Sequence, residues 1–192
     1  VGHSKGGIDS SVALAKHKNR LSDKVAGIAY LLSPINGALA PQLMEEWKLK
    51  RPITKALNFV LGADRKSFED LLPANREKFL KANPIDPKMP CFNLVGYSDF
   101  EAPSLIGQGL SALNQITWRE SGFMSDGMTI PALNIVPGCS VALVSNVDHA
   151  YPAQPAPGEP GSPGQYQYAT MRSILTAIKN KKHTTEGRSE TD

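Results

Sequence analysis

The five residues Gly2-His3-Ser4-Lys5-Gly6 constrain this chain more than any other feature. They match the pattern Gly-x-Ser-x-Gly, in which a sharp turn between a strand and a helix holds a serine in a strained backbone conformation with its hydroxyl exposed. Glycine suits both flanking positions because so tight a turn leaves no room for Cβ atoms. The sequence therefore predicts a strand end at Val1 and a nucleophile at Ser4.

The residues after this turn have the spacing of an amphipathic helix. Apolar side chains recur at helix-like intervals over residues 5–18, at Ile8, Val12, Leu14 and Ala15. A phosphate-binding loop is the alternative for a glycine-rich turn before a helix. However, Lys5 is not followed by Ser or Thr, as the P-loop pattern requires. The pattern therefore favours a nucleophilic serine.

Three short apolar runs predict strands, at residues 25–32, 92–98 and 140–147. The first run is continuous, which is typical of a strand buried on both faces, and the other two are similar. Because helical segments lie between the runs, we expect an α/β fold with a parallel sheet and helices on both of its faces.

The chain is long enough for one domain with a single core, at 192 residues and 41% hydrophobic content. We expect this domain to cover residues 1–180. Within it, about residues 38–90 form an insertion of short helices that caps the open end of the sheet. A Pro/Gly-rich loop at 152–164 and an amphipathic helix at 166–180 follow. Residues 181–192 are polar and are expected to be disordered.

The charge balance gives no sign of a nucleic-acid partner. Lysine and arginine number 21 against 18 aspartates and glutamates, and much of the net charge of +3 lies near the C-terminus. No apolar run approaches the roughly 20 residues of a membrane-spanning helix, so we expect no transmembrane segment. The chain begins at Val1 without a methionine, so we expect the true N-terminus to lie upstream.

The two cysteines, Cys91 and Cys139, each precede a predicted strand. Their spacing is not that of metal ligands, and we expect neither a metal nor another cofactor. Two free, buried thiols are the favoured interpretation. A disulfide between the two strand starts is the alternative, for a protein exported to an oxidising compartment.

A serine nucleophile requires a general base, and elimination leaves one of the four histidines. His3 adjoins Ser4, and its side chain is expected to point away from the nucleophile. His17 lies about 20 Å along the helix, and His183 is in the polar tail. His149 follows the last predicted strand, where the carboxyl ends of parallel strands meet. It is therefore the predicted base.

The third residue of such a site is a carboxylate that orients the histidine, and in folds with this turn it lies between the serine and the histidine in the sequence. Asp126 is favoured because it lies in a predicted turn, Ser125-Asp126-Gly127-Met128. Asp99 is the alternative because it directly follows the run 92–98. Asp148 is expected to face elsewhere.

Ester cleavage also needs N–H donors for the negative oxygen that forms at the acyl carbon. The backbone N–H of Lys5 is predicted to supply one of them in the oxyanion hole. The other donor is expected from a loop upstream of Val1. Because the strands before the turn are also expected upstream, we expect these 192 residues alone to be poorly folded and inactive.

Taken in order, these motifs resemble the secreted bacterial triacylglycerol lipases of the α/β-hydrolase superfamily. The resemblance spans about residues 1–150, through the segments 2–7, 32–37, 72–79, 83–84, 95–98, 125–128 and 148–149. It implies the C-terminal part of an α/β-hydrolase fold, starting at the nucleophile turn, and it implies secretion. Those lipases hold a structural calcium through an Asp two positions after the histidine. That position is Tyr151 here, so no such calcium site is expected.

The residues and the resemblance together predict a serine hydrolase of carboxylic esters, of the lipase or esterase type, acting through Ser4, Asp126 and His149 without a cofactor. Its expected substrate is a small-molecule or lipid ester, with the insertion as an apolar lid at a lipid–water interface. The alternatives are a polyester depolymerase or acyltransferase with the same three residues, or a non-catalytic relative.

Overall fold

The computed structural model describes residues 1–39, 69–86, 88–98, 111, 114–115, 117–153 and 171–180. Their strands form one sheet in the order β1 (Gly2–His3), β2 (Ile28–Leu31), β3 (Cys91–Tyr97) and β4 (Ser140–Ser145). The helices are α1 (Lys5–Lys16), α2 (Lys18–Leu21), α6 (Pro73–Ala82), α8 (Pro131–Asn134), the 3-10 helix η1 (Tyr151–Ala153) and helical segments at residues 117–121 and 171–180. The predicted α/β architecture is confirmed.

All neighbouring strands in this sheet are parallel. His3 lies opposite Leu31, Leu31 lies opposite Leu94, and Tyr97 at the end of β3 lies opposite Ser145 at the end of β4. Since parallel strands share their direction, the segments that follow them all leave the sheet at the carboxyl end of its strands. The sequence places Ser4 after β1 and His149 after β4, so both emerge there.

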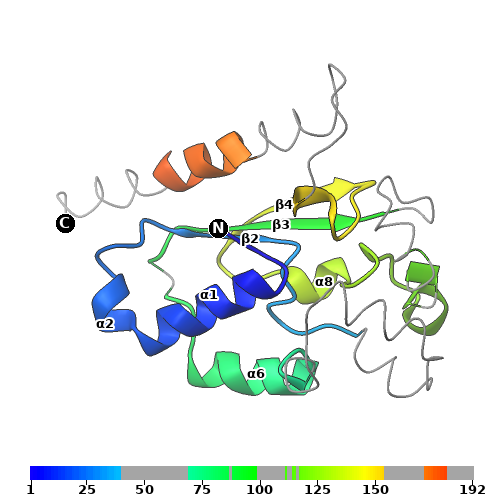
Figure 1. Cartoon of the computed structure of the whole chain (residues 1–192), viewed down its shortest axis with the longest axis horizontal. Helices are drawn as coiled ribbons and strands as arrows, with labels where there is room; N and C mark the ends of the chain where they lie inside the picture. Colours follow the sequence, from blue (N-terminus) through cyan, green and yellow to red (C-terminus); the bar gives the residue numbers. More distant parts are fainter. Residues whose placement is uncertain are drawn as a thin grey trace.

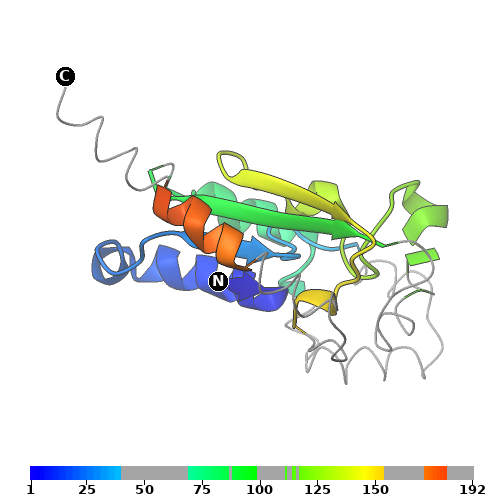
Figure 2. The same cartoon turned by 90° about the horizontal axis from the view of Figure 1, so that it is seen from above.

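Helices cover both faces of the sheet. Figures 1 and 2 place α1, α6 and α8 on one face and the helix at 171–180 on the other. The side chains of β2 alternate accordingly, because successive residues of a strand point to opposite faces. Ile28 and Tyr30 pack with Ile8 of α1, whereas Ala29 and Leu31 belong to the cluster of Ile174. All four residues of β2 are buried, as predicted.

The run at 140–147 forms a strand, as predicted, but the prediction that this strand is buried was wrong. Five of the six residues of β4 are exposed, including Leu143 at 61% and Val141 at 44%. β4 lies at one of the two edges of the described sheet, where it pairs with β3 alone and has no second neighbouring strand beside it. A continuous apolar run does not distinguish such a strand from a central one.

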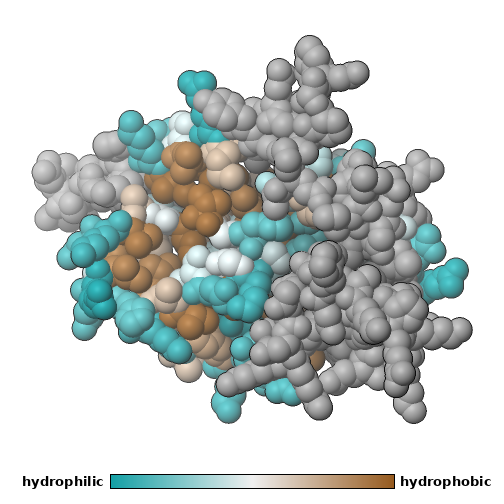
Figure 3. Space-filling view, viewed as in Figure 1, coloured by the Kyte–Doolittle hydropathy of each residue, from teal (hydrophilic) through white to brown (hydrophobic). Residues whose placement is uncertain are grey.

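Apolar side chains also gather at the surface around the helix at 171–180. Figure 3 shows an apolar patch over this helix and beside the start of the chain, where Val1 is 62% exposed and Leu175 is 53% exposed. Met171, Ile174 and Ile178 of the same helix instead face the sheet. None of the described helices combines the length and the apolar character that crossing a membrane requires.

The favoured interpretation of the cysteines was also wrong. Cys91 and Cys139 form a disulfide, with Cα atoms 4.6 Å apart. Cys91 opens β3 and Cys139 directly precedes β4, so the two positions are brought together by the pairing of these strands. The bond thus joins the starts of two strands, which is the alternative that the sequence left open.

Several predicted segments lie wholly or partly outside the described residues. Most of the expected capping insertion at 38–90 does so, although its helix α6 is described. The same holds for residues 154–170, which include most of the Pro/Gly-rich loop, and for the tail at 181–192.

Replacing both cysteines with alanine is expected to lower the free energy of unfolding. The disulfide spans 48 residues, and closing a loop of that length in the unfolded chain corresponds to about 4 kcal/mol. Urea denaturation of the wild type and of Cys91→Ala/Cys139→Ala measures the difference. A thiol reagent that labels both cysteines of the unfolded, unreduced wild type would contradict the assignment.

Candidate active site

The backbone of Ser4 has a conformation that few non-glycine residues adopt. Its φ is 52° and its ψ is −130°, and it connects β1 directly to α1. Hydrogen bonds hold it on both sides, because its N–H donates to the carbonyl of Leu31 (3.0 Å) and its carbonyl accepts from the N–H of Gly7 (3.1 Å). Such strain persists only where the surrounding structure imposes it, and it is concentrated at functional sites.

The glycines of the motif differ in how tightly they are packed. A Cβ on Gly2 would lie 2.5 Å from Gly7 Cα, so the turn requires glycine there. A Cβ on Gly6 would meet no atom of another part of the chain within 4 Å. The prediction that this position has no room for a Cβ was therefore wrong. Gly6 lies on the exposed side of the first turn of α1, whereas Gly7 faces inward and packs on the side chain of Ser33.

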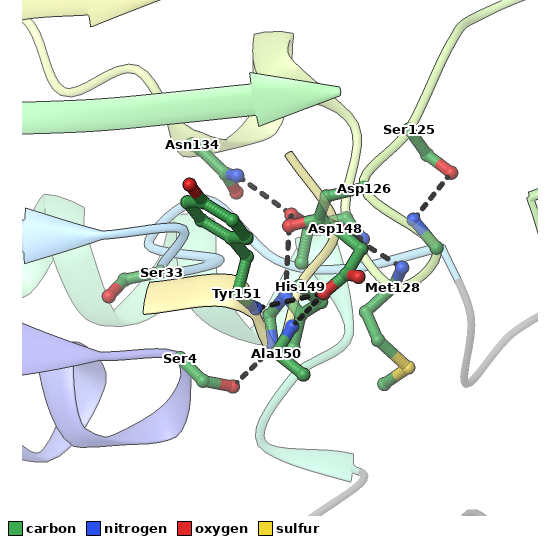
Figure 4. Close-up of polar contacts among 12 residues, drawn as sticks. Ser4, Ser33, Ser125, Asp126, Met128, Asn134, Asp148, His149, Ala150 and Tyr151 are labelled. Carbon is green, nitrogen blue, oxygen red and sulfur yellow. Dashed lines mark hydrogen bonds and ion pairs between the residues drawn. The ribbon is translucent and has the colours of Figure 1, made fainter. Parts of the chain in front are cut away.

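The structure brings Ser4, His149 and Asp126 together (Figure 4). His149 Nε2 lies 2.7 Å from Ser4 Oγ, and His149 Nδ1 lies 2.8 Å from Asp126 Oδ2. Asp126 is fully buried and His149 is 6% exposed, whereas Ser4 is only partly buried. The three side chains form one hydrogen-bonded chain that runs from the interior to the serine hydroxyl.

Four donors converge on the carboxylate of Asp126. Oδ1 accepts from the N–H groups of Met128 (2.9 Å) and Thr129 (2.7 Å). Oδ2 accepts from the hydroxyl of Thr129 (2.9 Å) and from His149 Nδ1. An ionised carboxylate only accepts hydrogen bonds, so each of these four groups donates to Asp126.

This arrangement decides the direction of the hydrogen bonds. Because the Asp126 carboxylate is an acceptor, His149 Nδ1 must carry the proton of that bond. In a neutral imidazole the other nitrogen is then an acceptor, so Ser4 Oγ donates its proton to His149 Nε2. The hydroxyl proton therefore points at a base that can remove it.

The loops that carry the acid and the base are joined to β3 and to each other. Ser98 N–H donates to the Ser125 carbonyl (3.0 Å) and Val147 N–H donates to the Tyr97 carbonyl (3.0 Å), so both loops are hydrogen-bonded to the end of β3. His149 N–H donates to the Asp126 carbonyl (2.8 Å). The turn of the acid loop also needs Gly127, whose φ of 98° is unfavourable for other residues.

Other predicted residues have separate partners. Asp148 is buried beside His149, and its Oδ1 accepts from the N–H groups of Ala150 (2.9 Å) and Tyr151 (2.8 Å). The side chain of Lys5 pairs with Asp9 (2.7 Å), while its backbone N–H lies in the first turn of α1, where helical N–H groups lack an intrahelical acceptor. Asp99 and His183 lie outside the described residues.

Sequence reasoning missed three polar residues at this site. Thr129 contacts Asp126, and Asn134 Nδ2 donates to the Thr129 hydroxyl (2.7 Å). His3, which the sequence considered only as a base and set aside, has its Nε2 2.7 Å from the carbonyl oxygen of His149. The turn chemistry of Asp-Gly-x-Thr is a sequence signal for Thr129, but Asn134 and His3 are placed by contacts that only the fold creates.

Metal ligation has no candidate cluster in the part of the chain that the structure describes. There, no group of three or more His, Cys, Asp or Glu side chains is arranged so that it could hold a metal ion. The polar groups of the site are bound to one another instead, as the hydrogen bonds of Asp126 illustrate.

Comparison with known proteins finds similarity in structure. No protein-family model and no curated protein sequence matches the chain. The mature form of lipase BlEst2 of Bacillus licheniformis is similar over 77% of this chain and 56% of its own, with a TM-score of 0.60 and 22% identity. The metagenomic carboxyl esterase MGS0156 is similar over 93% of this chain and 55% of its own, with a TM-score of 0.68 and 20% identity.

These similarities confirm the α/β-hydrolase fold that the sequence predicted. The chain spans about half the length of either structure. At 20–22% identity the comparison concerns the fold, and the chemistry of this chain must be argued from its own site.

Thr129→Val is expected to destabilise the fold by about 1–3 kcal/mol, because it removes one donor from a buried carboxylate and leaves Asn134 Nδ2 without its acceptor. Thr129→Ser keeps the hydroxyl and should lose less. Urea denaturation of both variants measures this. Equal stability of the valine variant and the wild type would contradict a structural role for this hydroxyl.

Proposed function

We propose that this chain carries the catalytic residues of a serine hydrolase that cleaves carboxylic esters, with Ser4 as nucleophile, His149 as general base and Asp126 as the acid that orients it. The observation that carries the proposal is the hydrogen-bonded chain from Asp126 through His149 to Ser4, with distances of 2.8 and 2.7 Å. The strained backbone of Ser4 supports it, since it belongs to a turn that exposes a nucleophile.

The first half of the reaction forms an acyl-enzyme. Ser4 Oγ attacks the acyl carbon while its proton passes to His149 Nε2. The resulting imidazolium is stabilised by the Asp126 carboxylate, which accepts the hydrogen bond from His149 Nδ1. When the tetrahedral intermediate collapses, the alcohol leaves with the proton from Nε2, and the acyl group stays on Ser4.

The second half restores the enzyme. A water molecule attacks the acyl-serine, His149 takes one of its protons, and Ser4 recovers a proton as the carboxylic acid leaves. Both tetrahedral intermediates carry a negative oxygen. We assign the backbone N–H of Lys5 to it, because this group lies directly after the nucleophile at the positive end of α1.

The substrate is proposed to have an apolar acyl part. An apolar cavity of about 320 Å³ lies beside the loop that carries the base, and its lining includes Leu31, Leu94, Val144, Val147, Tyr151, Met171 and Ile174. Such a lining suits hydrocarbon groups better than charged ones. The names of the similar structures, a lipase and a carboxyl esterase, support the same substrate class. More specifically, we propose that the substrate is triacylglycerol at a lipid–water interface.

Export to an oxidising compartment is proposed for the protein. Its support is the disulfide between Cys91 and Cys139, because structural disulfides form and persist outside the reducing cytosol.

The proposal predicts that Ser4→Ala abolishes ester hydrolysis. In the full-length protein that contains this chain, kcat for p-nitrophenyl butyrate is expected to fall by roughly 10⁴-fold or more, since the nucleophile is lost. The butyrate and palmitate esters are compared in the same assay, and faster turnover of the palmitate ester is the result that the lipase form of the proposal predicts.

Ser22→Ala is the matched control. Ser22 is exposed at the end of α2, so its loss should leave kcat unchanged. Activity that survives Ser4→Ala, or a wild type that hydrolyses neither ester, would rule the proposal out.

A further inference from the structure

His3 makes a contact that the reaction scheme above does not use. It is the last residue of β1, and its ring nitrogen Nε2 lies 2.7 Å from the backbone carbonyl oxygen of His149. The two imidazole rings are neighbours, with centroids 5.3 Å apart and planes inclined by 41°. The residue before the nucleophile therefore touches the residue proposed as the base, although they are far apart in the sequence.

The chemistry of this contact fixes the direction of its hydrogen bond. A carbonyl oxygen can only accept, so His3 Nε2 must carry a proton and donate it. The backbone of His149 is then held on two sides, because its N–H donates to the Asp126 carbonyl and its carbonyl accepts from His3. These bonds attach the backbone of His149 both to the acid loop and to the turn that holds Ser4.

We propose that His3 is a positioning residue, which holds the backbone of His149 against the nucleophile turn and so sets the distance between Ser4 Oγ and His149 Nε2. This inference rests on the function proposed above. It concerns a different atom from those that react, since His3 contacts the backbone of His149 and not its reacting nitrogen.

The protonation state of His3 is consistent with this role. Burial lowers the pKa of His3, and the nearby His149 lowers it further, while the hydrogen bond to the His149 carbonyl and the charge of Asp126 act in the opposite direction. A neutral His3 with its proton on Nε2 can donate this bond without placing a second cation beside the His149 imidazolium that forms during the reaction.

The test compares His3→Leu with His3→Gln in the full-length protein that contains this chain. Leucine has no donor, whereas the Gln side-chain amide can donate from near the position of Nε2. For p-nitrophenyl butyrate, we expect His3→Leu to lower kcat about 10- to 100-fold with little change in KM, because misplaced reacting groups slow the chemical step. His3→Gln should restore kcat to within about threefold of the wild type.

A second readout isolates attack by the serine. A p-nitrophenyl phosphonate phosphonylates Ser4, with a new Oγ–P bond, loss of nitrophenolate and transfer of the serine proton through His149 to solvent. Its rate constant should follow the order of kcat in the two variants. His17→Leu is the matched control, since His17 is exposed at the end of α1 and its loss should change neither rate.

The tautomer of His3 tests the same inference without any substitution. In ¹⁵N-labelled wild type, NMR should find neutral His3 protonated on Nε2. Protonation on Nδ1 would overturn the inference, as would wild-type rates in His3→Leu or equal losses in His3→Leu and His3→Gln. Failure of the phosphonate to label Ser4 in the wild type would instead overturn the proposed function on which the inference rests.

Discussion

The strained backbone of Ser4 is the constraint on which the rest of this site depends. A residue at φ 52° and ψ −130° stays there only because β1 pairs with β2 on one side and α1 begins immediately on the other. The close approach of Gly2 to Gly7 lets strand and helix meet without a gap. This geometry lifts the serine hydroxyl out of the turn and leaves the first N–H groups of α1 beside it, so one local structure provides both the proposed nucleophile and a proposed oxyanion donor.

The remainder of the site is built on the ends of β3 and β4. The loops that carry Asp126 and His149 are hydrogen-bonded to the end of β3, and a further backbone bond joins the two loops beside the contact of their side chains. The carboxylate is buried, yet four donors surround it, which compensates for its loss of water. Thr129 and Asn134 extend this network away from the serine, so the orientation of the imidazole depends on residues that never approach it.

The sequence predicted the parts of this arrangement that local chemistry controls. The motif at Ser4, the apolar run of β2 and the Asp-Gly turn at Asp126 each have a signal within a few residues, and each prediction places its residue where the structure has it. The predictions that failed depend on what lies beside a segment. Exposure of β4 follows from its outer place in the described sheet, and the disulfide follows from the pairing of β3 with β4. The hydrogen bond of His3, which the sequence did not predict, likewise depends on a loop 146 residues away.

The central claim is that Ser4 and His149 act as one unit, and a double-mutant cycle tests it most directly. The values of kcat for ester hydrolysis are compared for Ser4→Ala, His149→Ala and the double variant. If the two residues share one proton transfer, the second substitution lowers kcat little further once the first has been made. All three variants then retain similar residual activity. If the double variant instead loses the product of the two single effects, the residues act independently and the account is wrong.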